Sequence, residues 1–112
     1  MSKFAECMEL YKAQNSELGL GLSESLLTSV AKGLGPSIYN PDSSKVSGSD
    51  KTELDRVKTN FLIKKLGLAD SPALDAGIAE AMEKMGTSNR NKYRAVVYAL
   101  LTVKFGKESV YN

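Results

Sequence analysis

The feature that most constrains the fold is a run of nine uncharged, mostly apolar residues, Ala95–Val103, near the carboxyl end of the chain. Cap-type residues, Ser88 and Asn89, precede the run, and Gly106 follows it. A helix that is apolar nearly all round must be buried on most of its sides. We therefore predict a central helix over residues 89–105, around which the other elements pack.

Four further segments show the spacing of amphipathic helices, with apolar residues recurring every three or four positions. Ser, Asp and Pro start signals and Gly stop signals set their ends. These signals predict helices over residues 2–17, 23–33, 50–66 and 71–85. No segment alternates apolar and polar residues before a hairpin turn. The sequence thus predicts an all-α bundle of about five helices in a single domain, residues 1–112.

One long connection, residues 35–49, interrupts this pattern, and loops of such length in small domains are either functional or loosely ordered. Tyr39, Asn40 and Asp42 in this loop are polar or aromatic residues suited to recognition of a partner. The favoured alternative is an ordered cover over one end of the bundle. In that alternative Ile38 and Tyr39 are buried, and Val46 also attaches the loop to the core.

Composition excludes several classes of protein. The single cysteine, Cys7, cannot form an internal disulfide, which fits a reducing compartment. Glu6 and Glu9 interrupt any apolar core of a signal peptide. The longest apolar run is far shorter than the roughly 20 residues that span a bilayer. We expect a cytoplasmic protein without a membrane partner.

The residues needed for common enzyme chemistry are missing from the sequence. There is no histidine, the most frequent general base and metal ligand. No Ser or Cys has an identifiable base partner, and Asp42-Ser43-Ser44 lacks the acidic spacing of a calcium loop. We therefore predict no enzyme activity and no catalytic, cofactor or metal site.

Arg90, Lys92 and Arg94 form the densest charge cluster, in a segment where residues 89–112 contain five cations and one acid. Cations at the amino end of a helix oppose its dipole, so anions are expected nearby. Those anions are either carboxylates of the preceding helix, namely Asp75, Glu80 or Glu83, or phosphates of a nucleic acid. An internal salt-bridge network is the favoured alternative.

Several stretches resemble a known family of small bacterial cytoplasmic proteins classed as a domain of unknown function. They are residues 35–40, 60–68, 89–98 and 105–111. The resemblance implies an all-helical fold and no known activity, cofactor or catalytic residue.

We therefore predict a non-enzymatic interaction module that binds an unidentified protein through the surface around Arg90, Lys92, Arg94 and the loop at 35–49. The alternative is a nucleic-acid-binding protein that uses the same cations.

Overall fold

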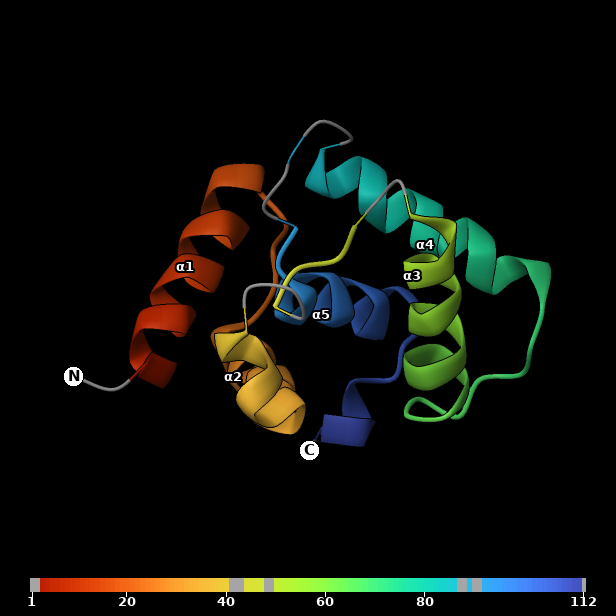
Figure 1. The fold of residues 1–112 in the computed structure, drawn as a ribbon, viewed down its shortest axis with the longest axis horizontal. Coiled ribbons are helices and arrows are strands. Elements are labelled where there is room, and N and C mark those ends of the chain that lie inside the picture. Colours follow the sequence, from red (N-terminus) through yellow and green to blue (C-terminus); the bar gives the residue numbers. More distant parts are fainter. Residues whose placement is uncertain (1–2, 41–43, 48–49, 87–88, 90–91, 112) are drawn as a thin grey trace.

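The computed structural model of the chain describes residues 3–40, 44–47, 50–86, 89 and 92–111. The described residues form five α-helices, which are labelled in Figure 1. Their bounds are Lys3–Leu18 for α1, Glu24–Leu34 for α2, Lys51–Arg56 for α3, Pro72–Met85 for α4 and Arg94–Lys104 for α5. Three short helical segments complete the fold: the 3₁₀-helices η1 (Gly35–Tyr39) and η3 (Glu108–Tyr111) and the π-helix η2 (Val57–Ile63). The described residues contain no strand, so the all-α prediction is confirmed.

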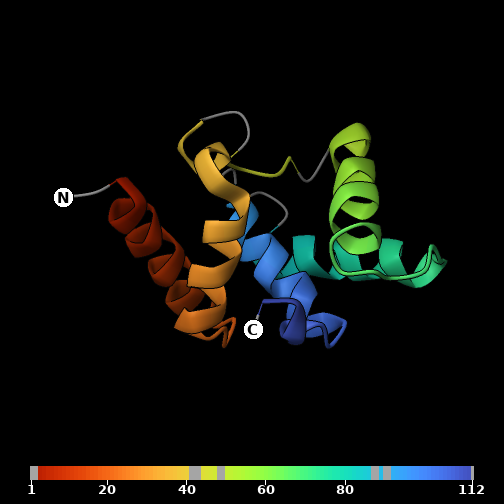
Figure 2. The same cartoon turned by 90° about the horizontal axis from the view of Figure 1, so that it is seen from below.

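Helix α5 occupies the centre of the molecule, as the sequence predicted. The pair α1–α2 lies on one side of α5, and α3, η2 and α4 lie on the other, in both views (Figures 1 and 2). Eight consecutive residues of α5, from Ala95 to Thr102, are buried. The last residue of the uncharged run, Val103, is 45% exposed. The apolar run is therefore surrounded by helices except at its final position.

Helix α5 begins five residues later than predicted, at Arg94 instead of residue 89. Tyr93, directly before it, is extended, because residues 92–94 pair with residues 44–46. The amide of Val46 donates to the carbonyl of Lys92 at 2.7 Å, and the amide of Arg94 donates to the carbonyl of Ser44 at 2.8 Å. These two hydrogen bonds form an isolated antiparallel bridge between Lys45 and Tyr93. The cations at 92 and 94 therefore do not both lie in the first turns of a helix, which corrects the prediction.

The predicted loop at 35–49 is partly regular. Its first residues form η1, which buries Ile38, and Val46 is also buried, as predicted. Tyr39 is 42% exposed, so its predicted burial is wrong. The carboxyl end of η1 turns this ring outward while the neighbouring Ile38 enters the core.

The predicted helix over 50–66 starts as expected and then changes its hydrogen-bonding pattern. The Asp50 carboxylate caps α3 by accepting from the amides of Thr52, at 3.0 Å, and Glu53, at 3.4 Å. From Val57 the helix widens into η2. The spacing of the apolar residues alone did not distinguish an α-helix from a π-helix over this segment, since either type of helix can bury one face.

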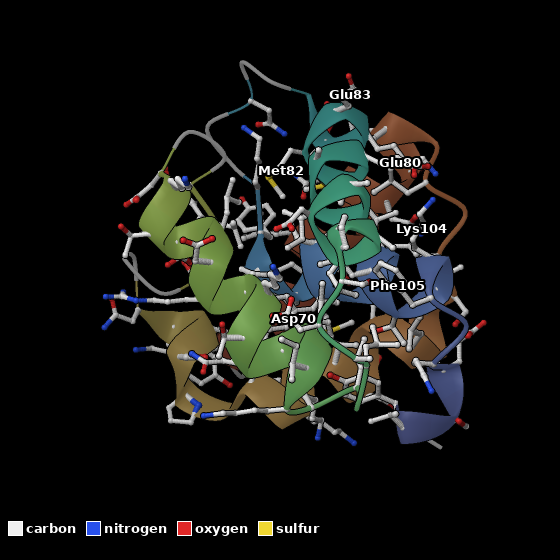
Figure 3. The ribbon with its side chains drawn as sticks, turned by 90° about the vertical axis from the view of Figure 1, so that its right-hand side faces the viewer. Asp70, Glu80, Met82, Glu83, Lys104 and Phe105 are labelled. Atoms are coloured by element: carbon white, nitrogen blue, oxygen red, sulfur yellow. The ribbon has the colours of Figure 1, made fainter. Side chains whose placement is uncertain are left out.

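Helices α4 and α5 pack closely around a glycine. A Cβ atom at Gly77 would lie 2.5 Å from Cζ of Phe105, so a side chain there would displace the ring. On the same side of the molecule, Lys104 Nζ lies 2.5 Å from a carboxylate oxygen of Glu80 (Figure 3). This contact lowers the pKa of Glu80 below its ordinary value. The close approach explains how the end of α5 stays attached to α4.

The carboxyl-terminal segment returns to the core through a tyrosine. Tyr111 lies against Gly33 of α2, and the Lys65 ammonium lies 5.3 Å from the centre of its ring. Its neighbour Val110 is 37% exposed. Tyr111 therefore docks on the core, whereas Val110 remains partly exposed. No helix in the described part of the chain is long and apolar enough to cross a membrane.

Leu100→Ala tests the central position of α5. The Leu100 side chain is 7% exposed, so its truncation should lower the free energy of unfolding by about 2–5 kcal/mol. Val103→Ala in the same helix is the matched control and should change the free energy of unfolding by less than about 0.5 kcal/mol. Urea denaturation measures both, and equal losses would show that α5 is not buried as described.

Tyr111 should make the fold sensitive to alkaline pH. Burial, followed by the nearby Tyr98, raises the pKa of the Tyr111 phenol from 10.0 to about 12. In the unfolded chain the phenol ionises at a lower pH than in the folded protein. The stability that the buried neutral phenol contributes is therefore fully present below about pH 10 and is lost as the pH rises towards 12. Urea titrations across this range should show a smaller loss of stability in Tyr111→Phe than in the wild type. Identical losses would mean that Tyr111 is solvated in the folded protein.

Candidate functional site

Arg94 of the predicted basic cluster is engaged within the protein. Its guanidinium forms an ion pair with Glu53 of α3, and Nη1 donates to the Tyr98 hydroxyl at 2.9 Å. The side chains of Arg94 and Glu53 are only 14% and 16% exposed. Burial acts to lower the pKa of Arg94, but Tyr98 and Glu53 outweigh this effect and raise it. Arg94 therefore connects α5 to α3 as a permanent cation.

Lys92 is also turned inward. The residue is 5% exposed, and its Nζ donates to the carbonyl oxygen of Asn89 at 2.5 Å. The internal ion pair that the sequence favoured thus exists for Arg94, although its partner Glu53 belongs to α3. Of the predicted partners, Glu80 pairs with Lys104 and Lys84, and Asp75 pairs with Lys58.

Of the other predicted site residues, Tyr39 and Asn40 lie in the described part of the chain. Tyr39 and Asn40 are exposed at the end of η1, where the Asn40 carbonyl accepts from the amide of Ser44 at 2.8 Å. Arg90 and Asp42 lie outside the described residues. Within the described part of the chain, no three cysteine or acidic side chains gather closely enough to hold a metal ion.

A hollow that the sequence analysis did not identify lies between α1 and the carboxyl end of α4. Its volume is about 540 Å³. We name it the α1–α4 groove; its walls include Leu10, Ala13, Glu17 and Leu18 of α1, with Met85 of α4 and Tyr93. The carboxyl ends of α1 and α4 both lie at the top of the molecule in Figure 1. The groove adjoins the extended segment that precedes α5, because Tyr93 and Asn89 also border it.

Two exposed leucines give the α1–α4 groove its apolar character. Leu10 is 49% exposed and Leu18 is 38% exposed, whereas Met85 is fully buried. Exposed apolar residues that adjoin a hollow are typical of interaction sites. The sequence contained a signal for part of this surface: Leu10 lies off the α1 stripe of Phe4, Cys7, Met8 and Tyr11 that faces the core. Leu18 continues that stripe, seven residues after Tyr11, and is partly exposed at the last position of α1.

The fold and the groove define a helical domain with an apolar surface on its first helix. The chain belongs to the family described as "Protein of unknown function (DUF2853)", whose model matches residues 10–109. This confirms the resemblance to a domain of unknown function.

A curated relative extends the comparison to a longer protein. The chain is similar to a protein of Schizosaccharomyces pombe named as an uncharacterized oxidoreductase, with 31% identity over 104 residues. The match covers 84% of this chain and 42% of the relative. The chain therefore spans about two-fifths of the length of that relative.

A double-mutant cycle on Arg94 and Glu53 tests the internal ion pair. Because both side chains are mostly buried, Arg94→Ala and Glu53→Ala should each reduce the free energy of unfolding by about 2 kcal/mol. The double variant should lose less than the sum, with a coupling of about 1 kcal/mol or more. The exposed pair of Lys12 and Glu24 is the control, and its coupling should stay below about 0.5 kcal/mol. Additive losses at Arg94 and Glu53 would contradict the pair.

Proposed function

We propose that this protein is a non-enzymatic interaction module that binds a protein partner through the α1–α4 groove. The observation that supports this proposal is the exposure of Leu10 and Leu18 beside a hollow of about 540 Å³. Burying such side chains against a partner removes apolar surface from water, which is the main favourable term in protein association. This proposal places the contact on α1, beside the segment of the predicted basic cluster.

The partner segment that best fits the groove is an amphipathic helix. Leu10 and Leu18 are eight residues apart, so they stand about 12 Å apart along α1. Two turns of a partner helix span a similar distance, and its apolar residues recur at i, i+4 and i+7. A helix laid along the groove would thus contact both leucines from one face. Glu17 at the wall would pair with a lysine or arginine of the partner.

The longer yeast relative gives independent support to a role in contact with other protein. More than half of its length lies outside the match, so the matched region shares its polypeptide with further sequence. A bacterial source and a cytoplasmic location, expected from the family resemblance and from the lone Cys7, belong to the same proposal.

The nucleic-acid alternative has less support. Lys92 donates to a backbone carbonyl and Arg94 pairs with Glu53, so binding phosphate would require these contacts to break. Surface lysines that bind phosphates in other proteins keep their ammonium groups in solvent.

Oxidoreductase activity is the second candidate, favoured by the name of the yeast relative. A direct assay would incubate the purified protein with reduced nicotinamide and flavin cofactors and a panel of carbonyl and quinone acceptors. Turnover above that of a heat-denatured sample would establish an activity and contradict a non-enzymatic module.

The interaction proposal is tested by replacing the two exposed leucines together. The tagged wild type and Leu10→Ser/Leu18→Ser should first be shown to unfold at similar urea concentrations. A partner captured from the host lysate is then purified, and its dissociation constant is measured for both proteins. We expect affinity to fall at least tenfold in the variant, since central apolar contacts dominate interface energies. Val103→Ser removes an exposed apolar residue outside the groove and should bind as the wild type does.

Each other outcome has a distinct meaning. Unchanged affinity in Leu10→Ser/Leu18→Ser would reject the groove as the contact surface. Captured material that nuclease removes, with a steep dependence of binding on salt, would favour the nucleic-acid alternative. A dimer that forms in the purified wild type and dissociates in the variant would identify a second copy of the chain as the occupant.

A further inference from the structure

A second, smaller hollow lies on the other side of the molecule, where the carboxyl-terminal segment enters between α2 and the lower end of α3 and η2 (Figure 1). Its volume is about 180 Å³. We name it the aromatic pocket; it is lined by Gly33, Asn60, Phe61, Lys65, Tyr98 and Tyr111, together with the side chain of Leu34. It shares no lining residue with the α1–α4 groove, so an inference about it does not depend on the proposed function.

Aromatic rings form most of the wall of this pocket. The rings of Phe61 and Tyr98 are stacked, with centres 3.9 Å apart and planes at 15°. The Tyr98 hydroxyl accepts from Arg94, which fixes the ring relative to α5. Tyr111 supplies a third ring, packed beside Gly33. Three rings held by separate elements form a preformed surface for a planar apolar group.

Polar groups border the same pocket on one side. Asn60 and Lys65 are both exposed, so the amide and the ammonium reach solvent at its rim. The Lys65 ammonium lies 5.3 Å from the Tyr111 ring centre, and no carboxylate of the described residues lies within ion-pair distance of it. Its positive charge is therefore available to an anion, and the Asn60 amide can donate a hydrogen bond beside it.

Asn60 lies in η2, and Lys65 follows two residues after its end, where i→i−5 hydrogen bonds continue beside an i→i−4 bond from the Lys65 amide to the Phe61 carbonyl. In an α-helix, residues five apart point about 140° away from each other. Here the amides of Lys64 and Leu66 donate to the carbonyls of Thr59 and Phe61, each five residues earlier, at 3.2 and 2.9 Å. A turn closed in this way places residues five apart nearly above one another, and such turns are frequent at functional sites.

We propose that the aromatic pocket binds a small carboxylate with one planar ring, a ligand of the size of benzoate. The ring lies against Phe61, Tyr98 and Tyr111, and the carboxylate faces Lys65 and Asn60. The volume agrees with this size, because an apolar protein cavity of about 150 Å³ accepts benzene. The Tyr111 phenol is neutral at physiological pH even at its ordinary pKa of 10.0, so this wall does not repel an anion.

The first test is a titration of the full chain with benzoate, followed by amide NMR. We expect saturable shifts centred on Asn60, Phe61, Lys65 and Tyr111. Benzamide keeps the ring without the charge, and acetate keeps the charge without the ring. Each should bind several-fold more weakly than benzoate. A linear, unsaturated response to benzoate would overturn the proposal, and so would acetate binding as tightly as benzoate.

The second test uses two adjacent lysines. Lys65→Ala should weaken benzoate binding about three- to tenfold, the range for loss of an exposed ion pair and its hydrogen bond. Lys64→Ala removes the same charge from an exposed residue that does not line the pocket, and it should bind benzoate as the wild type does. Equal weakening in both variants would show general attraction of anions and would reject the site. Unchanged binding in Lys65→Ala would also reject it.

Discussion

The rest of the structure depends on the burial of α5. Its residues Ala95–Thr102 have no solvent-exposed face, so no single neighbouring helix can cover them. Two groups of helices, α1 with α2 and α3 with η2 and α4, therefore pack against opposite sides of it (Figure 2). The hydrophobic effect sets this arrangement, since each uncovered side of α5 would leave apolar surface in water.

Polar contacts then fix the position of α5 among its neighbours. Arg94 at its start pairs with Glu53, and Lys104 at its end pairs with Glu80, so the two ends are attached to different helices. Apolar packing alone is non-directional and permits rotation or sliding of a helix. The mostly buried pair of Arg94 and Glu53 and the bridge between Lys45 and Tyr93 reduce that freedom, and the more exposed pair of Lys104 and Glu80 adds to them. Lys92 and Arg94 of the basic cluster thereby have a structural role at the start of α5.

The two surfaces proposed for binding have different origins. The α1–α4 groove exists because Leu10 lies beside the core-facing stripe of α1, and because Leu18 ends that stripe where the core no longer covers it. The aromatic pocket exists because three elements that are distant in sequence meet around stacked rings. The groove lies outside the central helix, and the aromatic pocket includes only Tyr98 of that helix. Such placement is usual for function added to a scaffold. Neither weakens the burial on which the fold depends.

The sequence by itself determined the helical class, the order of the helices and the central position of α5. These follow from local periodicity, capping residues and one uncharged run, which are properties of neighbouring residues. Tertiary structure decided the start of α5 at Arg94, the exposure of Tyr39, the π-helix and the pairing of Arg94 with Glu53. Each of these depends on contacts between segments far apart in the chain, such as the hydrogen bonds between residues 44–46 and 92–94 that keep Tyr93 extended before α5 begins. A local pattern contains no information on which distant partner a backbone or side-chain group will meet, and for that reason only the folded chain brings the residues of the two surfaces together.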